Sequence, residues 1–248
     1  MKKKKITVAG MLVQEAVYSV PAGRESAKVR AAKRKASSEA QQRMNAKYSW
    51  QKLELMLAAN LLPGDLVVTL TFDDEHLPPD RKTAAARLKK FRQAMAARRR
   101  EAGQDLRMIW TLENKSDAGR WHVHLALNST CDGDYQDVLQ CWPYGRDTEI
   151  RKLQVDRQKN YETLARYMCK EARERPGLRS WSYTRSCRHP ETETFTVPDD
   201  TDVLAPEGAT VLLDASLRTD YGSFHYVKYL AAEPVKLKRK GVRRKRKR

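Results

Sequence analysis

Two histidines, His122 and His124, flank one apolar residue in the strand-like segment Trp121-His-Val-His-Leu-Ala-Leu-Asn128. Because side chains alternate across a β-strand, both imidazoles leave one face and the apolar residues leave the other. Imidazole is a common metal ligand, so the spacing indicates a candidate metal site. The pattern alone is weak, because a short apolar strand can carry two histidines without a chemical role.

Glu113 offers a third ligand nine residues before His122. The segments on either side of the intervening turn alternate like strands and predict a β-hairpin. A register that pairs Glu113 with His122 also places Thr111 opposite His124, so the three candidate ligands share one face. Two imidazoles and a carboxylate with open positions suit Mg²⁺ or Mn²⁺ beside a phosphate, or Zn²⁺ beside a water. The alternative for Glu113 is an exposed strand-end carboxylate next to Arg120.

A tyrosine further along the chain could act as a nucleophile. Asp156 is placed to cap a helix that runs to about Glu174. On that helix Tyr161 falls in the apolar stripe and is assigned to the core, whereas Tyr167 lies on its flank near Lys170. A phenol is a poor nucleophile until a nearby cation or metal lowers the cost of ionising it, which Lys170 could help to provide. The alternative for Tyr167 is an aromatic side chain that extends helix packing.

The periodicity of the chain predicts the elements that position these residues. Apolar residues at helical spacing indicate helices, and alternating apolar residues indicate half-buried strands. Asp80 is a candidate N-cap, and Gly103 follows the end of the same helix. The expected elements are helices over about 38–60, 80–101 and 156–174, a strand over 66–72, the hairpin strands 107–113 and 121–128, and strand-like segments over 16–20, 178–189, 210–213 and 224–230.

Three motifs, in order, resemble those of the HUH single-strand endonucleases, in the rolling-circle replication initiator branch of phages and plasmids. The segment from Val67 to Phe72 is similar to the first-motif strand, and His122-Val-His124 is similar to the His-apolar-His metal motif. The segment from Leu164 to Lys170 fits the pattern apolar-x-x-Tyr-apolar-x-Lys. The resemblance covers about residues 40–190, and three ordered motifs are more specific than any one of them.

This resemblance implies a fold, a reaction and a cofactor. The fold is α+β, with a central antiparallel β-sheet flanked by helices, and the expected elements are compatible with it. The reaction is a transesterification in which Tyr167 attacks a scissile phosphate of single-stranded origin DNA, leaving a 5′-phosphotyrosine link and a free 3′-OH. Lys170 would neutralise developing charge. The expected cofactor is Mg²⁺ or Mn²⁺, held by Glu113, His122 and His124.

One position departs from part of that family. Some phage initiators pair two tyrosines four residues apart on the nucleophile helix, but Thr163 occupies the earlier position here. Tyr161 is six residues away, which puts it about 120° round the helix from Tyr167. We therefore expect a single-tyrosine enzyme.

Positive charge is unevenly distributed along the chain. The net charge is +18, but Lys2 to Lys5 and the ten basic residues of 236–248 account for most of it, and the rest holds 35 basic against 31 acidic residues. Blocks of like charge predict disordered arms that attract a polyanion, although a solubility device is an equal alternative. The residues expected to contact DNA phosphates are Arg87, Lys89, Lys90, Arg92, Arg120 and Arg166.

The remaining features bear on organisation and location. We expect a basic N-terminal arm over 1–37, the endonuclease domain over 38–190, an extension of unknown role over 191–235 and a basic tail over 236–248. Four separated cysteines without a Cys-x-x-Cys pair indicate reduced thiols. No apolar run reaches membrane-spanning length and no secretory signal is recognisable, so we expect the cytoplasm of a bacterial host cell and no membrane partner. The chain has no phosphate-binding loop of an ATPase, so a host helicase and polymerase are expected partners.

Two other functions remain open on the sequence alone. A non-catalytic nucleic-acid-binding protein would bind DNA through aromatic and basic residues without metal dependence or a covalent adduct. A zinc hydrolase would use Glu113, His122 and His124 around a water, and its activity would survive the change Tyr167→Phe.

Overall fold

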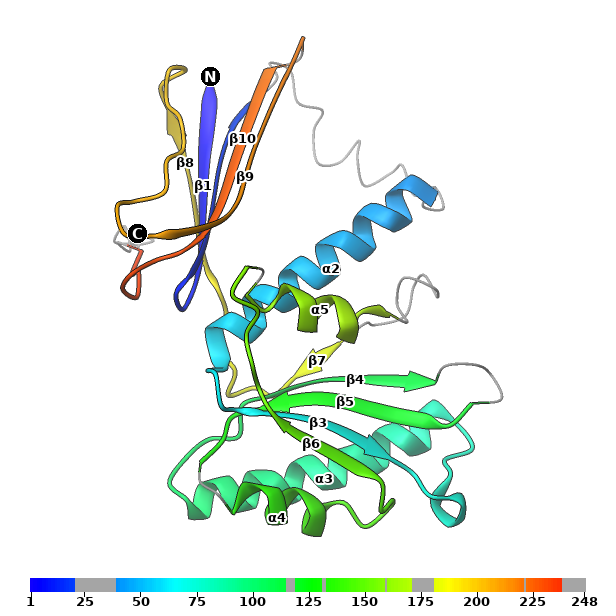
Figure 1. The fold of residues 1–248 in the computed structure, drawn as a ribbon. Coiled ribbons are helices and arrows are strands. Elements are labelled where there is room, and N and C mark those ends of the chain that lie inside the picture. The colour runs from blue at the N-terminus through cyan, green and yellow to red at the C-terminus, as the bar shows by residue number, and fades with distance from the viewer. Residues whose placement is uncertain are drawn as a thin grey trace, which may run out of the picture. The chain divides into compact units, whose positions relative to one another are not determined.

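The chain folds into two compact units, and each contains a five-stranded antiparallel sheet (Figure 1). The computed structural model describes residues 1–20, 39–114, 119–130, 133–158, 160–170, 181–220 and 222–237. The central unit comprises Ser26–His189, and the terminal unit comprises Met1–Glu25 together with Pro190–Arg248. The expected α+β class, with an antiparallel sheet flanked by helices, is confirmed.

The sheet of the central unit carries the predicted hairpin. Its strand order is β6-β3-β5-β4-β7. Glu113 pairs with His122 and Thr111 pairs with His124, so the predicted register is confirmed. The strands are β3 (Leu66–Thr71), β4 (Met108–Asn114), β5 (Trp121–Leu127), β6 (Thr148–Lys152) and β7 (Ser182–Tyr183).

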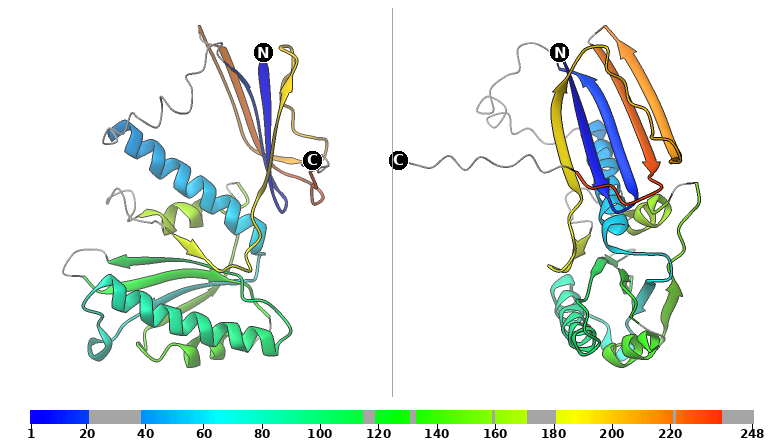
Figure 2. Two further views of the ribbon diagram at one scale, coloured as in Figure 1. Left: turned by 180° about the vertical axis from the view of Figure 1, so that it is seen from behind. Right: turned by 90° about the vertical axis from the view of Figure 1, so that its left-hand side faces the viewer.

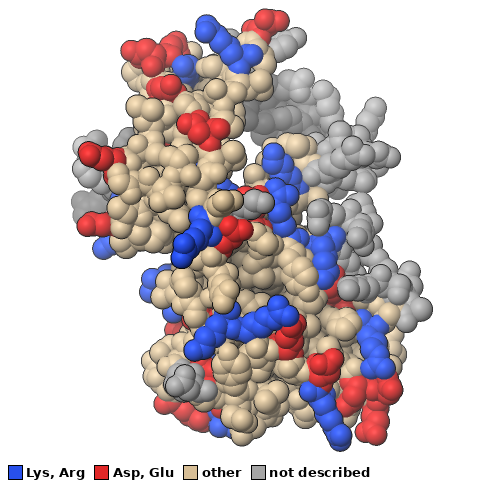
Figure 3. Space-filling model, in the orientation of Figure 1, with Lys and Arg blue, Asp and Glu red and all other residues tan. Residues whose placement is uncertain are grey.

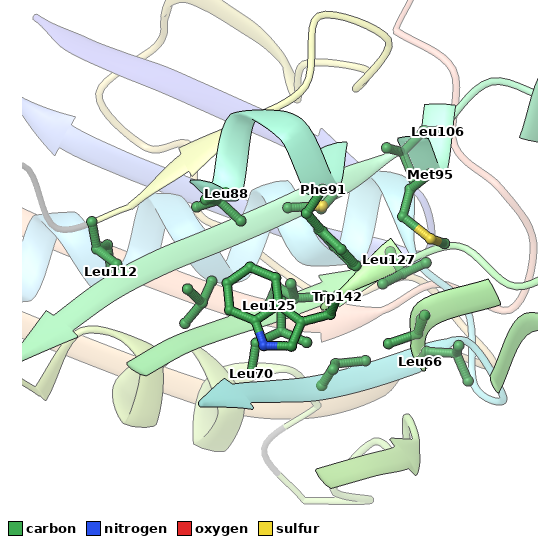
Figure 4. Close-up of a cluster of buried hydrophobic side chains, with 14 of the residues drawn as sticks. Leu66, Leu70, Leu88, Phe91, Met95, Leu106, Leu112, Leu125, Leu127 and Trp142 are labelled. Atoms are coloured by element: carbon green, nitrogen blue, oxygen red, sulfur yellow. The ribbon is translucent and has the colours of Figure 1, made fainter. Parts of the chain in front are cut away.

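One face of this sheet is covered by α3 (Arg81–Glu101) and α4 (Asp134–Cys141). The carboxylate of Asp80 accepts a hydrogen bond from the Thr83 amide at 2.7 Å, which confirms the predicted N-cap. Figure 4 shows Leu, Phe and Met side chains of α3 packed against leucines of β3 and β5 and against Trp142. Each fully buried Leu or Phe side chain contributes roughly 1.5–3 kcal/mol, so this core fixes the sheet that carries the histidines.

The opposite face of the sheet packs against α2 (Glu39–Asn60) and α5 (Glu162–Met168), as Figures 1 and 2 show. Leu53 and Leu57 of α2 are fully buried, and they share a cluster with Ile109 of β4 and Ala126 of β5. The sheet is therefore covered on both sides, and the histidine face is the one beside α5.

The helix expected from Asp156 begins later than predicted. Asp156 forms a bridge with Asn160 and accepts a hydrogen bond from the Gln158 amide at 2.8 Å. Asn160 has a φ of 55°, a left-handed conformation that interrupts a right-handed helix. α5 therefore starts at Glu162, with Tyr161 at its N-cap position. The predicted end at Glu174 lies outside the described residues.

The terminal unit combines the two ends of the chain. Its strand order is β8-β1-β2-β10-β9, so the first strands lie between strands that follow the central unit. The expectation of a disordered arm is wrong for residues 2–19, because they form a β-hairpin within this sheet. The strands are β1 (Lys2–Ala9), β2 (Leu12–Ser19), β8 (Glu191–Val197), β9 (Thr210–Thr219) and β10 (Gly222–Leu230).

A small core holds the terminal unit together. Val13, Val17 and Val227 lie on one face of its sheet and pack with Val203, which belongs to the segment between β8 and β9. Residues 238–248, which make up most of the predicted basic tail, lie outside the described residues. Where the chain is described, no helix has the length and apolar composition needed to cross a membrane.

Candidate active site

Polar side chains form two neighbouring rows across one face of the central sheet. In the first row Thr71 of β3 pairs with His122, which pairs with Glu113 on its other side. In the second row Thr69 of β3 pairs with His124. Because the apolar positions of these strands point into the core beneath α3, the sheet alternation presents the polar ones together on the α5 side.

Glu113 and His124 form a buried pair. The Nε2 atom of His124 lies 2.7 Å from Oε2 of Glu113, and its Nδ1 atom lies 3.1 Å from Oγ1 of Thr69. The side chains of Glu113 and His124 are 5% and 9% exposed. The Nζ atom of Lys170, two residues beyond α5, lies 3.1 Å from the same Glu113 oxygen. Thr69 and Glu113 therefore hold the His124 ring in one orientation.

The carboxylate charge of Glu113 is stabilised by its partners. Burial acts to raise the pKa of Glu113, but hydrogen bonds and positive charge from His124 and Lys170 outweigh it and lower the pKa below its ordinary value. A buried carboxylate that stays ionised is a strong ligand for any cation that reaches it.

Tyr167 of α5 lies over this pair. Its ring meets the His124 ring edge to face, with the centroids 5.1 Å apart, and Nζ of Lys170 lies 3.9 Å from the Tyr167 ring centroid. Tyr167 is 46% exposed, so its phenol is open to a ligand. Tyr161, by contrast, is buried and donates a hydrogen bond from its hydroxyl to the Leu61 carbonyl at 2.6 Å, as its assignment to the core predicted.

A pocket of about 490 Å³ opens at these side chains. Two of its lining residues, Asp147 and Glu149, were not predicted from the sequence. Glu149 of β6 pairs with Thr69, and Asp147 directly precedes β6. The alternation of Glu149 with Ile150 could have indicated a strand with an acidic face, but the sequence does not specify which strand it joins. The pocket is lined by Thr69, Thr71, His122, His124, Asp147, Glu149, Tyr167 and Lys170.

The donor set fits a divalent cation chemically. The 2.7 Å between Glu113 Oε2 and His124 Nε2 is close to the roughly 3 Å between neighbouring ligands of an octahedral Mg²⁺. The rings of His122 and His124 lie nearly parallel, with centroids 6.5 Å apart. Among the described residues, however, no three His, Cys, Asp or Glu side chains converge into a ligand group. The structure thus pairs two of the three predicted ligands and leaves His122 on the same face beside them.

The basic residues predicted on the 80–101 helix do not lie at this pocket. They belong to α3, which packs on the opposite face of the sheet. The guanidinium of Arg87 lies 5.2 Å from the Tyr144 ring centroid, and that of Arg92 lies 4.4 Å from the Trp110 ring centroid. Lys89 and Lys90 are exposed. The four residues thus belong to a different surface from the one that holds Tyr167.

The other two predicted phosphate contacts have protein partners. Arg120 donates a hydrogen bond to the Phe72 carbonyl at 3.1 Å and forms an ion pair with Asp74. Arg166 pairs with Glu162 at 2.8 Å and lies over the Trp50 ring, 4.0 Å from its centroid. On the face seen in Figure 3, Lys and Arg side chains lie among Asp and Glu and form no single continuous basic surface.

Comparison with known proteins places a family match over this part of the chain. Residues 65–172 match a family model of replication-associated proteins of the ORF2 type. The matched segment covers less than half of the chain, and it contains Glu113, both histidines, Tyr167 and Lys170. No curated protein and no solved structure matches the chain. The similarity supports a replication initiator family, a role in DNA replication and the binding of DNA, and it is compatible with nuclease activity.

Proposed function

We propose that the chain is a rolling-circle replication initiator of the HUH endonuclease type, which nicks single-stranded origin DNA with Tyr167 as nucleophile. The match over residues 65–172 supports the role in replication. The observation that carries the chemistry is that an exposed tyrosine lies against the His124 ring and beside the Lys170 ammonium in one pocket. Few structural roles require a tyrosine, a lysine and a buried His–Glu pair to meet at an open pocket.

The reaction exchanges one phosphodiester for another. The Tyr167 oxygen attacks the phosphorus and forms a P–O bond, the bond from phosphorus to the 3′-oxygen breaks, and the phenol proton leaves the site. The 3′-oxygen takes up a proton and becomes a free 3′-OH, while the 5′-phosphate stays on Tyr167. The ammonium of Lys170 lies beside the Tyr167 ring, where positive charge favours the phenolate.

Glu113, His122 and His124 would hold Mg²⁺ or Mn²⁺ at this face. A bound divalent cation supplies charge that polarises the scissile phosphate, which is worth several kcal/mol in phosphoryl transfer. The chain's own residues orient the site: Thr69 and Glu113 bind the two nitrogens of His124 and fix its ring.

The nick would serve DNA synthesis in the host. The free 3′-OH is a primer for a host polymerase, and a host helicase would separate the strands, since the chain has no ATPase loop of its own. This role places the protein in the cytoplasm of a bacterial host.

The test is covalent capture of DNA. The full chain is incubated with Mn²⁺ and single-stranded oligonucleotides that tile the DNA around its own gene, and the products are run on a denaturing gel. We expect a DNA–protein band that requires the metal, is absent in Tyr167→Phe and persists in Tyr161→Phe.

Three outcomes contradict the proposal. Binding without any band points to a non-catalytic DNA-binding protein. A band that persists in Tyr167→Phe places the nucleophile elsewhere. Stoichiometric zinc with hydrolysis that survives Tyr167→Phe indicates a zinc hydrolase.

A further inference from the structure

One face of the sheet in the terminal unit carries aromatic and basic side chains in register. Phe224 of β10 pairs with Tyr18 of β2, and Tyr18 pairs with Lys3 of β1. In the next row on the same face, Tyr226 pairs with Ala16, and Ala16 pairs with Lys5. We call the surface formed by Lys3, Lys5, Tyr18, Phe224 and Tyr226 the aromatic face.

The two faces of this sheet differ in charge. The strands hold four acidic residues, and the pairing places every one of them on the face opposite the aromatic face, with Val13 and Val17. They are Glu15, Glu191, Glu193 and Asp214. Among the strand residues of this sheet, the aromatic face thus carries lysine charge without carboxylate charge. A polyanion is attracted to such a surface and repelled from the other one.

The aromatic face is not the side that builds the core of the terminal unit. That core lies on the face of Val13 and Val17, beneath the segment that contains Val203. Phe224 is 43% exposed and Leu217, its neighbour on β9, is 62% exposed. Towards the other end of the strands the same side carries buried residues such as Lys228, so the exposed part is the end with Lys3 and Phe224.

The two β10 rings are arranged as a stacking platform. The rings of Phe224 and Tyr226 lie 6.4 Å apart between centroids and within 6° of parallel. Residues two apart on a strand repeat at about 7 Å, roughly twice the stacking distance of bases, so two ring faces in line can each receive a base. Unpaired bases present their faces to such rings, whereas bases in a duplex are stacked on each other.

We propose that the aromatic face binds single-stranded DNA, with bases stacked on Phe224, Tyr226 and Tyr18 and phosphates paired with Lys3 and Lys5. The choice of DNA as the nucleic acid rests on the proposed replication function. Exposed rings favour unpaired bases, and the uniform positive charge favours a phosphate backbone. The face would hold the strand that Tyr167 nicks, or the strand displaced by synthesis, through contacts that do not depend on a divalent metal.

The experiment measures affinity for a fluorescent oligothymidine by anisotropy, with the full chain in a chelating buffer that removes divalent metal. Phe224→Ala and Tyr226→Ala should each weaken binding by about tenfold, because stacking of one base is lost. Phe224→Leu keeps an apolar side chain and should weaken binding to a similar extent. The matched control is Phe195→Ala, because Phe195 pairs with Lys4 on the opposite face.

The lysines are tested by salt dependence. The double variant Lys3→Ala with Lys5→Ala should lower the slope of log affinity against log salt by about 1.4, since each phosphate contact to a single strand contributes about 0.7. Lys2→Ala is the matched control, because Lys2 lies on the same strand and the other face. Circular dichroism melts establish that each variant is folded.

Folded Phe224→Leu and Tyr226→Ala variants that bind oligothymidine as tightly as the wild type overturn the inference. So does an equal loss of affinity for duplex DNA, which would mean that the rings do not read unpaired bases. A loss confined to oligoribouridine, with oligothymidine unaffected, assigns the face to RNA and overturns the assignment to DNA.

This result is separable from the fate of the proposed nickase. Variants of the aromatic face should still form the Tyr167 adduct at saturating DNA, and Tyr167→Phe should still bind oligothymidine. Weakened binding in the face variants, without an adduct in any protein, supports the aromatic face and rejects the nickase.

Discussion

The two tyrosines of the α5 region show how environment separates a packing residue from a candidate nucleophile. Burial raises the pKa of Tyr161 to about 12, and the nearby Asp65 carboxylate acts in the same direction. Its hydroxyl is occupied by the Leu61 carbonyl. Tyr167 instead exposes its ring to the pocket beside His124 and Lys170. Removing each hydroxyl should therefore have different consequences.

Tyr161→Phe should lower stability and leave the covalent adduct intact. The buried hydrogen bond to Leu61 is worth about 1 kcal/mol, so the urea midpoint should fall while adduct yield stays at the wild-type level. Tyr167→Phe should show the reverse, with an unchanged midpoint and no adduct. Loss of the adduct in a folded Tyr161→Phe variant would assign the nucleophile to Tyr161.

Lys170→Met should slow nicking without unfolding the chain. The ammonium that contacts Glu113 and lies beside Tyr167 is removed, and loss of one such positive group costs roughly 10²–10³-fold in rate. The measurement is the single-turnover rate of adduct formation at saturating oligonucleotide. Lys89→Met, on the exposed side of α3, is the matched control and should react at the wild-type rate. Equal rates for the two variants would show that Lys170 has no part in the reaction.

At the scale of elements, the sequence predicts what depends on local pattern. The register of β4 with β5 follows from alternation on both arms of one hairpin, and it brings Glu113 and His122 together. The pocket's acidic edge does not follow, because Glu149 reaches Thr69 only through the pairing of β6 with β3, which alternation does not specify.

The terminal sheet was missed for a related reason. Its lysine-rich first strand has the composition of a solvated arm, yet Lys4 forms an ion pair with Glu15 at 2.6 Å and Lys2 pairs with Val197 at the far end of the chain. Such a contact is stabilised by partners that no local window contains. Helix α5 was extended too far towards the N-terminus because the left-handed Asn160 breaks a pattern that periodicity alone continues.

Helix α3 is tied to α4 by a buried ion pair. Arg99 of α3 donates to Asp134 at 2.5 Å, and both side chains are almost fully inaccessible. Asp134 also accepts hydrogen bonds from the Ser129 hydroxyl and the Thr130 amide, both at 2.6 Å. Burial alone would raise the pKa of Asp134, but these hydrogen bonds and the Arg99 charge lower it to about 2.

Asp134→Ala should destabilise the central unit by about 3–5 kcal/mol, because it leaves the Arg99 charge buried and unpaired. Urea unfolding followed by tryptophan fluorescence measures this. The control is Asp137→Ala, whose partner Arg98 lies 3.7 Å away at the surface, and its cost should be at most about 1 kcal/mol. Equal costs for the two variants would mean that the buried pair contributes no more than a surface pair.

At the scale of the whole molecule, the two units can be followed by different signals. All five tryptophans, at positions 50, 110, 121, 142 and 181, belong to the central unit. Tryptophan fluorescence therefore reports the central unit, whereas far-ultraviolet circular dichroism reports the strands of both. A transition that is present in dichroism and silent in fluorescence belongs to the terminal unit.

The terminal unit contains a histidine held between two carboxylates. His225 of β10 binds Asp202, in the segment between β8 and β9, through Nδ1, and it binds Asp214 of β9 through Nε2 at 2.8 Å. Hydrogen bonds from Asp202 and then Asp214 raise the pKa of His225 above its ordinary value. The Asp202 pKa is lowered, first by its hydrogen bond with His225, and Lys2 adds a further positive charge.

The terminal unit should accordingly lose stability as the pH rises from about 6 to about 9. Below the unfolded pKa of about 6.5 His225 is protonated in both states, and its ion pairs contribute fully to folding. Above that value only the folded state holds the proton, so the contribution shrinks, and it is gone once the pH exceeds the raised folded pKa. The urea midpoint of the fluorescence-silent transition should fall over this range, and His225→Gln should remove the pH dependence. A slope that His225→Gln leaves unchanged would assign the titration to another group, since the two carboxylates would then hold no proton on His225 that folding depends on.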